Sequence, residues 1–521
     1  MSSVRVIHAS YVNVPATAAP LPELIKLTPM EVPWVVLPEL QRVLLFAPLA
    51  GKIVHLEDTG DVAIACSTLD GVRFLVAECD GEMRHLAGDE EHDVCVLERL
   101  VPGVDMGELL ILVLAVQATR FEGVKIIASN YVSVPESQAP PPEPIKLTAL
   151  EARWVVFPVL QHVLLYVGAD MPPFDAVLQS LRSSLSATLG SFAPLAGKLV
   201  HLEETGDVAI SCSASDGVRP RVPSLEGGVA VGLTVHHGVA DGRSLWMFVK
   251  AWATACRGEM PAATPCFDRS LVKLPGGQDL ARSGLRKFAP NLPLTAPPAW
   301  FTRRTFTLDV QDIQRLKQHI VRLGVGEASS HSPRPRPPST FAAVAALAWT
   351  CFIRCRPFIS DEEEALLIFL ADVRDRLDPP VEAGYIGVCL WPCLVKLPAG
   401  ELRGQRALAA AASAIRDEVR KMREVPVATW DFQTSLLAGR PMDRLMSVSG
   451  SPRFSAYEDA DFGWGKPRRT EPIRMNHDGQ IALMGAGDGH GVQVSVSLLQ
   501  PAQMDLFKSH FLDLLGLTKN N

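Results

Sequence analysis

The sequence predicts an α/β protein of more than one domain, and three observations support this class. The chain has 521 residues, more than one ordinary hydrophobic core accommodates. Apolar residues make up 47% and charged residues 21%, a balance typical of globular rather than disordered proteins. Segments of alternating polarity are interleaved with segments in which apolar residues recur every three or four positions. This mixture predicts strands and helices distributed along the whole chain.

Individual elements can be predicted in chain order. Alternating apolar and polar residues predict strands at 231–235, Val-Gly-Leu-Thr-Val, and at 492–498, Val-Gln-Val-Ser-Val-Ser-Leu. Helical spacing of apolar residues defines three further segments: 309–323, 341–353 and 406–423. Residues 324–338 are rich in Ser, Pro, Arg and Gly, so we expect a surface loop there, at the boundary between two lobes.

The first half of the chain repeats itself imperfectly. Residues 11–15, Tyr-Val-Asn-Val-Pro, return 120 positions later as residues 131–135, Tyr-Val-Ser-Val-Pro. Residues 47–52, Ala-Pro-Leu-Ala-Gly-Lys, return unchanged at 193–198, which is 146 positions later. The second copy therefore keeps 26 residues, around 167–192, that the first copy lacks. Their apolar residues are spaced as in a helix.

The opposite gap lies further along each copy. After Asp70-Gly71-Val72 the first copy continues for about 50 residues, whereas after Val218 the second copy reaches Glu226 almost at once. Stacked solenoid repeats do not show such complementary gaps. We therefore interpret residues 1–123 as a partial duplicate, either of the natural protein or of a fused gene model. Whether it folds, docks or is a passenger stays open; one alternative is that residues 75–122 fill the gap in the second copy.

Charge and composition exclude several classes of function. The formal net charge is −7 and the isoelectric point is near 6.0, which argues against nucleic acid as a partner. No apolar run reaches the roughly 18 residues of a membrane span, and the first residues lack a signal-peptide pattern. Ten cysteines show no zinc-like spacing and are expected to be reduced thiols. We expect a cytoplasmic protein that binds no membrane and no metal.

The strongest local signal is His-His-Gly-Val-Ala-Asp-Gly at residues 236–242, directly after the strand predicted at 231–235. The His237 ring can take and return a proton near neutral pH, and Asp241 can fix its orientation. The alternative is that these residues only cap a helix beginning near Arg243. His236 is expected to be a packing residue. The chain has no Ser or Cys nucleophile motif, P-loop or dinucleotide fingerprint.

Residues 236–242 resemble the HxxxD motif of the BAHD acyltransferases, which also occurs in condensation domains and chloramphenicol acetyltransferases. A second segment, Asp-Phe-Gly-Trp-Gly at 461–465, matches the DFGWG signature and favours the BAHD family among these. By itself this segment would indicate only a glycine-rich turn. The resemblance covers residues 124–517 as a nearly complete protein and residues 4–123 as a second, partial copy.

Two further segments are similar to one clade of that family, which acylates flavonoid and other phenolic glycosides, often with malonyl-CoA. Tyr-Ile-Gly-Val-Cys at 385–389 resembles the YFGNC of this clade but departs from it at Ile386 and Val388. Ser-Pro-Arg-Phe at 451–454 is also similar. The resemblance implies a malonyl donor first and an aromatic acyl donor second, with a phenolic or flavonoid glycoside as acceptor.

The resemblance also implies a fold: two lobes of chloramphenicol acetyltransferase type with a tunnel between them, preceded by a partial duplicate of the N-terminal lobe. The expected units are the duplicate at 1–123, the N-terminal lobe at 124–325 and the C-terminal lobe at 326–521. The N-terminal lobe is shortened near 218–226, where family members carry more residues. Family members are usually monomers without a bound cofactor or metal, and acyl-CoA serves as a co-substrate.

Roles for individual residues follow from the same resemblance. His237 is the expected general base that removes the acceptor proton, so that the acceptor attacks the thioester without an acyl-enzyme. Asp241 is expected to hold the loop and to meet an arginine. Residues expected to be structural are Asp461, Phe462, Gly463, Trp464 and Gly465. Residues expected to contact CoA are Ser339, Thr340, Ala371, Asp372 and Arg374.

These expectations describe an acyl-CoA-dependent O-acyltransferase, and two alternatives stay open. Loss of the residues between Val218 and Glu226 favours a catalytically defective duplicate, because strands and a helix of the lobe that carries His237 would be missing. An amine-acylating relative would keep the same role for His237 with a different acceptor. Neither the donor nor the acceptor is named by the sequence.

Overall fold

The structure is a computed structural model whose description covers most of the C-terminal half and separate segments of the N-terminal half. The described residues are 4–13, 25–26, 52–56, 61–66, 71–79, 97, 100–101, 111–112, 114–121, 145–146, 149–152, 160–168, 171–191, 199–202, 207–211, 228–235, 237, 239–260, 265–273, 301–324, 336–424, 441–473, 475 and 477–516. Within these ranges no helix has both the length and the apolar character needed to cross a bilayer.

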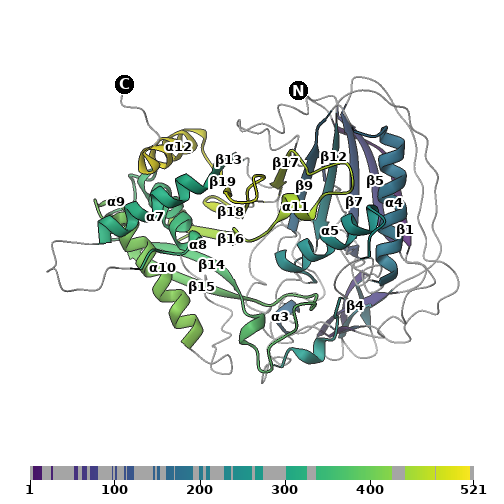
Figure 1. The fold of residues 1–521 in the computed structure, drawn as a ribbon. Helices are drawn as coiled ribbons and strands as arrows, with labels where there is room; N and C mark the ends of the chain where they lie inside the picture. Colours follow the sequence, from purple (N-terminus) through teal and green to yellow (C-terminus); the bar gives the residue numbers. More distant parts are fainter. Residues whose placement is uncertain are drawn as a thin grey trace.

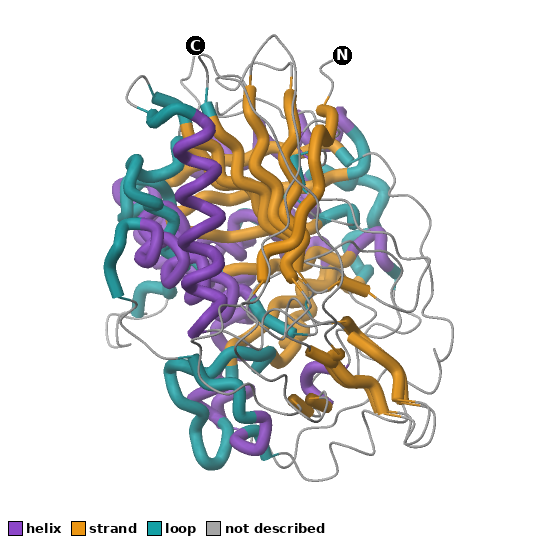
Figure 2. Tube along the Cα trace, turned by 90° about the vertical axis from the view of Figure 1, so that its right-hand side faces the viewer, coloured by secondary structure: helices purple, strands orange, loops and turns teal. Residues whose placement is uncertain are grey.

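A six-stranded sheet organises the first lobe (Figure 1). Its strands, in spatial order, are β1 (Val4–Asn13), β5 (Gly71–Cys79), β7 (Leu114–Phe121), β12 (Val229–Val235), β9 (Leu160–Tyr166) and β17 (Arg469–Pro472). Helices α4 (Phe174–Ser191) and α5 (Gly242–Cys256) pack against each other beside it, and α4 contacts β1. Figure 2 views the side on which β1 and α4 lie in Figure 1 and shows long strands running side by side next to a helix.

This sheet combines strands from residues 1–123 with strands from later in the chain. Three of its six strands, β1, β5 and β7, come from those residues, and β7 pairs with β12 along the whole length of β12. The physical reason is that a strand with only one neighbour leaves a row of backbone donors and acceptors without partners. The predicted boundary at residue 123 therefore does not separate two sheets.

A smaller, seven-stranded sheet contains the duplicated hairpins. It is formed by β2 (Ile25–Lys26), β3 (Lys52–Leu56), β4 (Asp61–Cys66), β6 (Ile111–Leu112), β8 (Ile145–Lys146), β10 (Leu199–Leu202) and β11 (Asp207–Ser211). The hairpin β3–β4 of the first copy and the hairpin β10–β11 of the second copy correspond to each other in the sequence repeat. They lie side by side, because β3 pairs parallel with β10 and β4 pairs parallel with β11.

The second lobe is built on another six-stranded sheet. Its spatial order is β13 (Thr302–Leu308), β19 (Val492–Leu498), β18 (Gln480–Gly485), β16 (Leu445–Gly450), β14 (Glu364–Asp372) and β15 (Leu390–Pro398). The helices beside it are α7 (Val310–Gly324), α8 (Thr340–Arg354), α9 (Ala399–Arg403), α10 (Ala407–Glu424) and α12 (Pro501–Leu515). The three helices and the strand predicted in this region, and the strand predicted at 231–235, are confirmed within one or two residues at each end.

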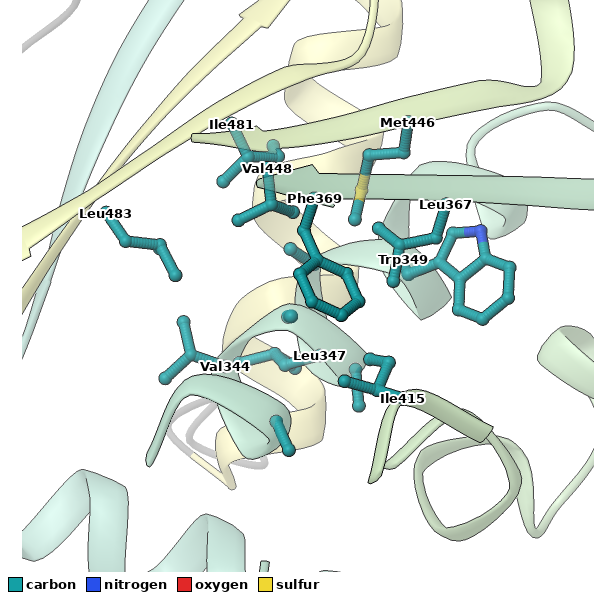
Figure 3. Close-up of a cluster of buried hydrophobic side chains, with 14 of the residues drawn as sticks. Val344, Leu347, Trp349, Leu367, Phe369, Ile415, Met446, Val448, Ile481 and Leu483 are labelled. Carbon is teal, nitrogen blue, oxygen red and sulfur yellow. The ribbon is translucent and has the colours of Figure 1, made fainter. Parts of the chain in front are cut away.

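The core of the second lobe lies between α8 and the sheet (Figure 3). Helix α8 is apolar on all sides, and its residues 342–353 are all buried. The side chains that meet across this core include Val344, Leu347, Trp349, Leu367, Phe369, Ile415, Met446, Val448, Ile481 and Leu483. Burial of a side chain of this size contributes roughly 1.5–3 kcal/mol. The lobe is therefore a firm support for the loops at the ends of β14 and β15.

The C-terminal part of the chain does not stay within the second lobe. Strand β17 pairs antiparallel with β9 of the first lobe, and Arg303 of the second lobe donates to the carbonyl oxygens of Pro472 and Ile473 beside it. Part of the segment expected to form the C-terminal lobe, 326–521, therefore completes the first sheet. The predicted boundary loop lies largely outside the described residues, at 325–335.

Candidate active site

His237 and Asp241 lie in the connection between β12, which ends at Val235, and α5, which begins at Gly242. Asp241 is the N-cap of α5: its backbone is extended and its Oδ1 accepts a hydrogen bond from the Ser244 N–H at 2.9 Å. The capping role considered for this motif is therefore real. It does not compete with a catalytic role, because the cap fixes the connection in which His237 is held.

The His237 side chain is buried, with 8% of its surface exposed. Burial lowers its pKa from 6.5 to about 4, although a backbone hydrogen bond and the nearby Asp241 carboxylate act in the opposite direction. The ring is therefore neutral at neutral pH and can accept a proton, which is what a general base requires. His236 and Gly238 lie outside the described residues.

The Asp241 carboxylate forms a buried ion pair with Arg374, whose Nη1 lies 2.7 Å from Oδ2. Burial alone would raise the pKa of this carboxyl. Arg374 and the N–H groups of Ser244 and Cys389 outweigh that effect and hold the pKa below its usual value. Asp241 is therefore ionised at neutral pH, and its carboxylate links α5 to the second lobe. The family resemblance implies an arginine partner for this aspartate, and the structure identifies it as Arg374.

The guanidinium of Arg374 is 2% exposed and has several other partners in addition to Asp241. Its Nη1 lies 3.1 Å from Asp372 Oδ1, and its Nη2 donates to the Ser244 hydroxyl at 3.1 Å and to the Gly387 carbonyl at 3.0 Å. This environment gives Arg374 a structural role. Its predicted contact with CoA stays a prediction that the burial of the guanidinium does not favour.

The loop at 385–389, Tyr-Ile-Gly-Val-Cys, is held against the start of α5. The Gly387 carbonyl accepts hydrogen bonds from the Ser244 hydroxyl at 2.9 Å and from the Asp241 N–H at 3.3 Å. A Cβ at Gly387 would lie 2.7 Å from the Tyr385 ring and 3.0 Å from Glu151 Oε1, so only glycine fits without displacing these groups. The loop thus connects the second lobe to the connection that carries His237.

A second buried ion pair supports the same loop from the other side. Arg269, on the short helix η2 (Arg269–Leu271), has its Nε 2.5 Å from Oε1 of Glu151 on α3 (Ala149–Ala152). Arg269 also donates to the Ile386 carbonyl, and its guanidinium lies 5.1 Å from the centre of the Tyr385 ring. The guanidinium of Arg374 lies 5.9 Å from the same ring centre. Tyr385 is therefore in contact range of two buried guanidinium groups.

Sequence reasoning missed Ser244, Glu151 and Arg269. Ser244 stands three positions after Asp241, and this N-cap spacing was the one available signal. Glu151 and Arg269 are 118 positions apart and belong to no motif, so only the folded chain brings them together.

The remaining residues predicted to contact CoA lie at two places in the second lobe. Ser339 caps α8, with its hydroxyl oxygen accepting from the Ala342 N–H at 3.1 Å. Thr340 accepts a hydrogen bond at 2.9 Å from Nζ of Lys317 on α7. Lys317 was not predicted, and it adds a positive charge to the α8 N-terminus, where free N–H groups favour an anion.

The other place is the end of β14, where Ala371 and Asp372 lie next to Arg374. Asp372 is partly exposed and pairs with Arg243 of α5 at 3.1 Å as well as with Arg374. These contacts hold the Asp372 side chain in place. Direct contact of Ser339, Thr340, Ala371 or Asp372 with CoA stays a prediction.

The segment at 461–465 packs on the far end of α5. Asp461 Oδ1 accepts from the N–H groups of Gly463 at 2.9 Å and Gly465 at 3.1 Å, and both glycines have positive φ values, +101° and +94°. Phe462 meets Trp252 of α5 edge-to-face at 4.7 Å between ring centres and stacks on Trp464. Arg257, directly after α5, donates to the Asp461 carbonyl. This geometry supports the predicted structural role of Asp461, Phe462, Gly463, Trp464 and Gly465.

The two lobes meet at the Asp241–Arg374 pair, close to the buried His237. The family profile and the named relatives given next show the class, an acyl-CoA-dependent acyltransferase. The family profile described as the Transferase family matches residues 40–133, 123–219 and 221–514. Because these segments span most of the chain, the protein belongs to the Transferase family, the BAHD acyltransferases. The break between the second and third segments falls at residue 220, within the shortened stretch 218–226.

Several named proteins are similar in sequence. Phenolic glucoside malonyltransferase 2 of Arabidopsis thaliana is 28% identical over 432 residues, which are 70% of this chain and 93% of that protein. A malonyl-coenzyme A:anthocyanin 3-O-glucoside-6''-O-malonyltransferase of Dahlia pinnata is 26% identical, over 66% of this chain and 88% of that protein. Agmatine coumaroyltransferase of Arabidopsis thaliana is 25% identical, over 75% of this chain and 99% of that protein.

The fold is similar to that of solved structures. The crystal structure of F. sporotrichioides TRI101 complexed with coenzyme A and T-2 aligns with a TM-score of 0.52 at 16% identity, over 68% of this chain and 95% of that chain. F. graminearum TRI101 complexed with coenzyme A and deoxynivalenol also gives a TM-score of 0.52, at 15% identity, over 69% of this chain and 96% of that chain. At this identity the likeness concerns the fold, and it agrees with the predicted two-lobed architecture.

Proposed function

We propose that the protein transfers a malonyl group from malonyl-CoA to a hydroxyl of a phenolic or flavonoid glycoside, with His237 as general base. The observation that carries the proposal is the state of His237: neutral, buried, and fixed beside an aspartate that is fully engaged with Arg374. The similarity to phenolic glucoside and anthocyanin malonyltransferases supports the choice of donor and acceptor. The same chemistry accommodates an aromatic acyl donor as the second choice.

The proposed reaction needs one proton acceptor and no covalent enzyme intermediate. The acceptor O–H gives its proton to the neutral His237 ring while the oxygen attacks the thioester carbonyl. When the tetrahedral intermediate collapses, the C–S bond breaks and the sulfur leaves with the proton from the ring, giving free CoA and the ester. General-base assistance of this kind contributes roughly 10²–10⁴-fold to the rate.

The Cys389 thiol, next to Asp241, does not offer a covalent route. Cys389 donates its backbone N–H to Asp241, and burial raises the pKa of its thiol to about 12. A thiol with this pKa stays protonated at neutral pH and is a poor nucleophile. Direct attack by the acceptor is therefore the simpler route.

A place for the CoA moiety forms part of the same proposal. Ser339, Thr340 and Lys317 surround the N-terminus of α8, where an anionic phosphate is stabilised. Ala371 and Asp372, at the end of β14, lie beside the Asp241–Arg374 pair. In this arrangement the phosphates contact the second lobe, and the thioester reaches the connection that carries His237.

An amine-acylating enzyme is the second candidate, because one of the similar proteins is an agmatine coumaroyltransferase. It matches 75% of this chain, the same share as phenolic glucoside malonyltransferase 1 of Arabidopsis thaliana. An amine acceptor would also give a proton to His237 after attack, so the site does not discriminate between O-acylation and N-acylation. The identity of the acylated product distinguishes these two reactions.

The experiment is a matrix of donors and acceptors, followed by thiol release and product mass. Malonyl-, acetyl- and coumaroyl-CoA are each combined with phenolic glucosides, their aglycones and agmatine. We expect malonyl transfer to glucosides and loss of transfer in His237→Gln, with the exposed His490→Gln as a matched control that keeps activity. Transfer to agmatine alone would establish an amine-acylating enzyme. No transfer by a folded protein with any donor would support the defective duplicate.

A further inference from the structure

The strand that leads to His237 depends on the first copy of the duplication for one of its two neighbours. β12 pairs with β9 of the second copy on one side and with β7, residues 114–121, on the other. The pairing with β7 is antiparallel and continuous, with Val231 opposite Ala118 and Leu233 opposite Val116. In turn, β7 pairs parallel with β5 of the first copy.

Residues of the first copy also cover the face of β12. Leu97, Leu100 and Val101 are buried in one cluster with Ala230 of β12 and with residues of β9. The approach is close at Gly232, where an added Cβ would lie 2.1 Å from the Leu100 carbonyl oxygen and 3.0 Å from Val101 Cα. Because only a residue without a side chain allows this approach, Gly232 fits a strand that is covered by Leu100 and Val101.

The pieces that the two copies do not share occur together in this lobe. Helix α4, which only the second copy encodes, packs against α5 and β1. The segment after Val72, which only the first copy encodes, supplies most of β5, all of β7 and the buried residues Leu97, Leu100 and Val101. The hairpin that both copies encode is present twice, as β3–β4 and β10–β11.

We infer that the two copies fold as one composite lobe, in which residues 71–121 replace the part missing between Val218 and Glu226 and position His237 through β12. The structural part of this inference does not depend on the reaction; the positioning of His237 rests on the proposed function. Residues 1–123 are thus part of the enzyme and not a passenger. The shortened stretch at 218–226 also ceases to be an argument for a defective protein.

Engineered disulfides test the pairing without any assay of activity. Opposed residues in neighbouring antiparallel strands have Cα atoms about 4.5–5.5 Å apart, which a disulfide can bridge, whereas diagonal neighbours are about 7 Å or more apart. We expect Ala118→Cys with Val231→Cys to form a crosslink on mild oxidation, identified by peptide mapping. The control is Ala118→Cys with Leu233→Cys. It moves one thiol two positions along β12 on the same face of the sheet, so that the two thiols are diagonal rather than opposite. Absence of the first crosslink, or equal yield in the control, overturns the inference.

Gly232→Ala tests whether the covering residues position His237. We expect kcat to fall by up to ~10²-fold, because a small displacement of a catalytic group has an effect of that size. KM for acyl-CoA should stay within about twofold, since the proposed CoA residues lie in the other lobe. The acid limb of kcat should move from a pKa near 4 toward 6.5 as the ring gains access to water. The matched control is Gly168→Ala, whose Cβ would have only Met171 within 4 Å.

A cleavable full-length chain covers the case in which the substituted proteins fail to fold. A specific protease site is introduced at 136–141, outside the described residues, and the purified protein is cut there. We expect the two fragments to elute together in native gel filtration and to keep the activity of the uncut chain. If the smaller fragment separates and the larger one is active alone, the first copy is a passenger and the inference is wrong. If the chain shows no activity at all, co-elution of the fragments and the crosslink still show whether the two copies form one composite lobe. In that case only the proposed function fails.

Discussion

The carboxylate of Asp241 and the guanidinium of Arg374 meet at 2.7 Å with 1% and 2% of their side chains exposed, although they belong to different lobes. Asp241 caps the helix that follows His237, and Arg374 follows β14 of the second lobe. The same guanidinium holds Gly387 and Ser244. This ion pair therefore couples the geometry of the connection that carries His237 to the docking of the two lobes.

Removal of one member of this pair should destabilise the protein strongly. We expect Arg374→Met and Asp241→Asn each to lower the free energy of unfolding by about 3–5 kcal/mol, because each leaves the buried partner without compensation. The double variant should be less destabilised than the sum of the single variants. Urea denaturation measures this, with the exposed pair Lys396–Glu364 as control, where Lys396→Met should cost less than about 1 kcal/mol. Similar costs at both sites would contradict the assignment.

The Glu151–Arg269 pair should act on the 385–389 loop rather than on the base itself. Arg269→Met leaves Glu151 buried beside Gly387 and removes the hydrogen bond to the Ile386 carbonyl. We expect lower stability, and a kcat that is reduced while the acid limb of the pH profile is unchanged. The double variant with Glu151→Gln should recover part of the loss, because the uncompensated charge is removed. A kcat equal to that of the unaltered protein would show that the loop does not influence the site.

The pH dependence of kcat follows from the direction of the pKa shift at His237. Burial lowers the pKa to about 4, and the base is active when neutral. Activity should therefore persist below pH 6.5 and fall only as the pH approaches 4, measured with acyl-CoA and acceptor at saturation. An acid limb centred near 6.5 would indicate that the working ring is solvated and would contradict the buried geometry.

The same shift predicts how stability depends on pH. A histidine with a lowered pKa binds fewer protons in the folded state than in the unfolded state, so stability is lost as the pH falls from about 6.5 to about 4. Burial lowers the pKa of His162 to about 4 as well, and it lowers the pKa of His477. A single shift of this size corresponds to about 3 kcal/mol. Denaturation at a series of pH values should show His162→Gln to be less sensitive to acid in this window. An unchanged slope would contradict the burial of its ring.

Lys317 should contribute to binding of the CoA phosphates. We expect Lys317→Ala to raise KM for acyl-CoA by roughly 10-fold, the effect of losing about 1.4 kcal/mol of binding, and to leave KM for the acceptor unchanged. The difference should shrink at high salt, because partly exposed charges are screened. Lys508→Ala on the exposed side of α12 is the control. An equal rise in KM for acyl-CoA and for the acceptor would show that the CoA phosphates do not bind at Lys317.

Phe462→Ala should separate structural from catalytic effects at the DFGWG segment. The ring is 1% exposed and packs between Trp252 and Trp464, so we expect a loss of about 3–5 kcal/mol in stability. At a temperature at which the variant remains folded, kcat should be close to that of the unaltered protein. A loss of kcat without a loss of stability would assign the segment a direct role.

Local patterns predicted several regular elements of this protein. Helices α7, α8 and α10 and strands β12 and β19 carry strong periodicity, and each is found close to its predicted bounds. The resemblance implied that Asp241 meets an arginine, but the sequence did not identify Arg374, which was assigned to CoA. The two residues are 133 positions apart, and a short motif contains no information on such a contact.

The assembly of the first lobe was also beyond the reach of local patterns. β17 pairs with β9 across about 300 positions, and β7 pairs with β12 across a whole second copy of the repeat. The complementary gaps in the two copies leave two alternatives open, in which the first copy is a passenger or a partner of the second. Pairing depends on which edges of the folded sheet are available, and this is a property of the complete chain.

The central claim is that His237 transfers the acceptor proton during acyl transfer from CoA. We would measure, in a single turnover with malonyl-CoA and a phenolic glucoside, the appearance of free CoA thiol and of the malonylated glucoside. We expect both to appear together at equal rates and only when the acceptor is present. We also expect His237→Gln to slow both by roughly 10²–10⁴-fold while the protein stays folded. Two results would contradict the role of His237 as general base in direct transfer. One is thiol release without acceptor, together with malonyl-labelled protein; the other is full activity in His237→Gln.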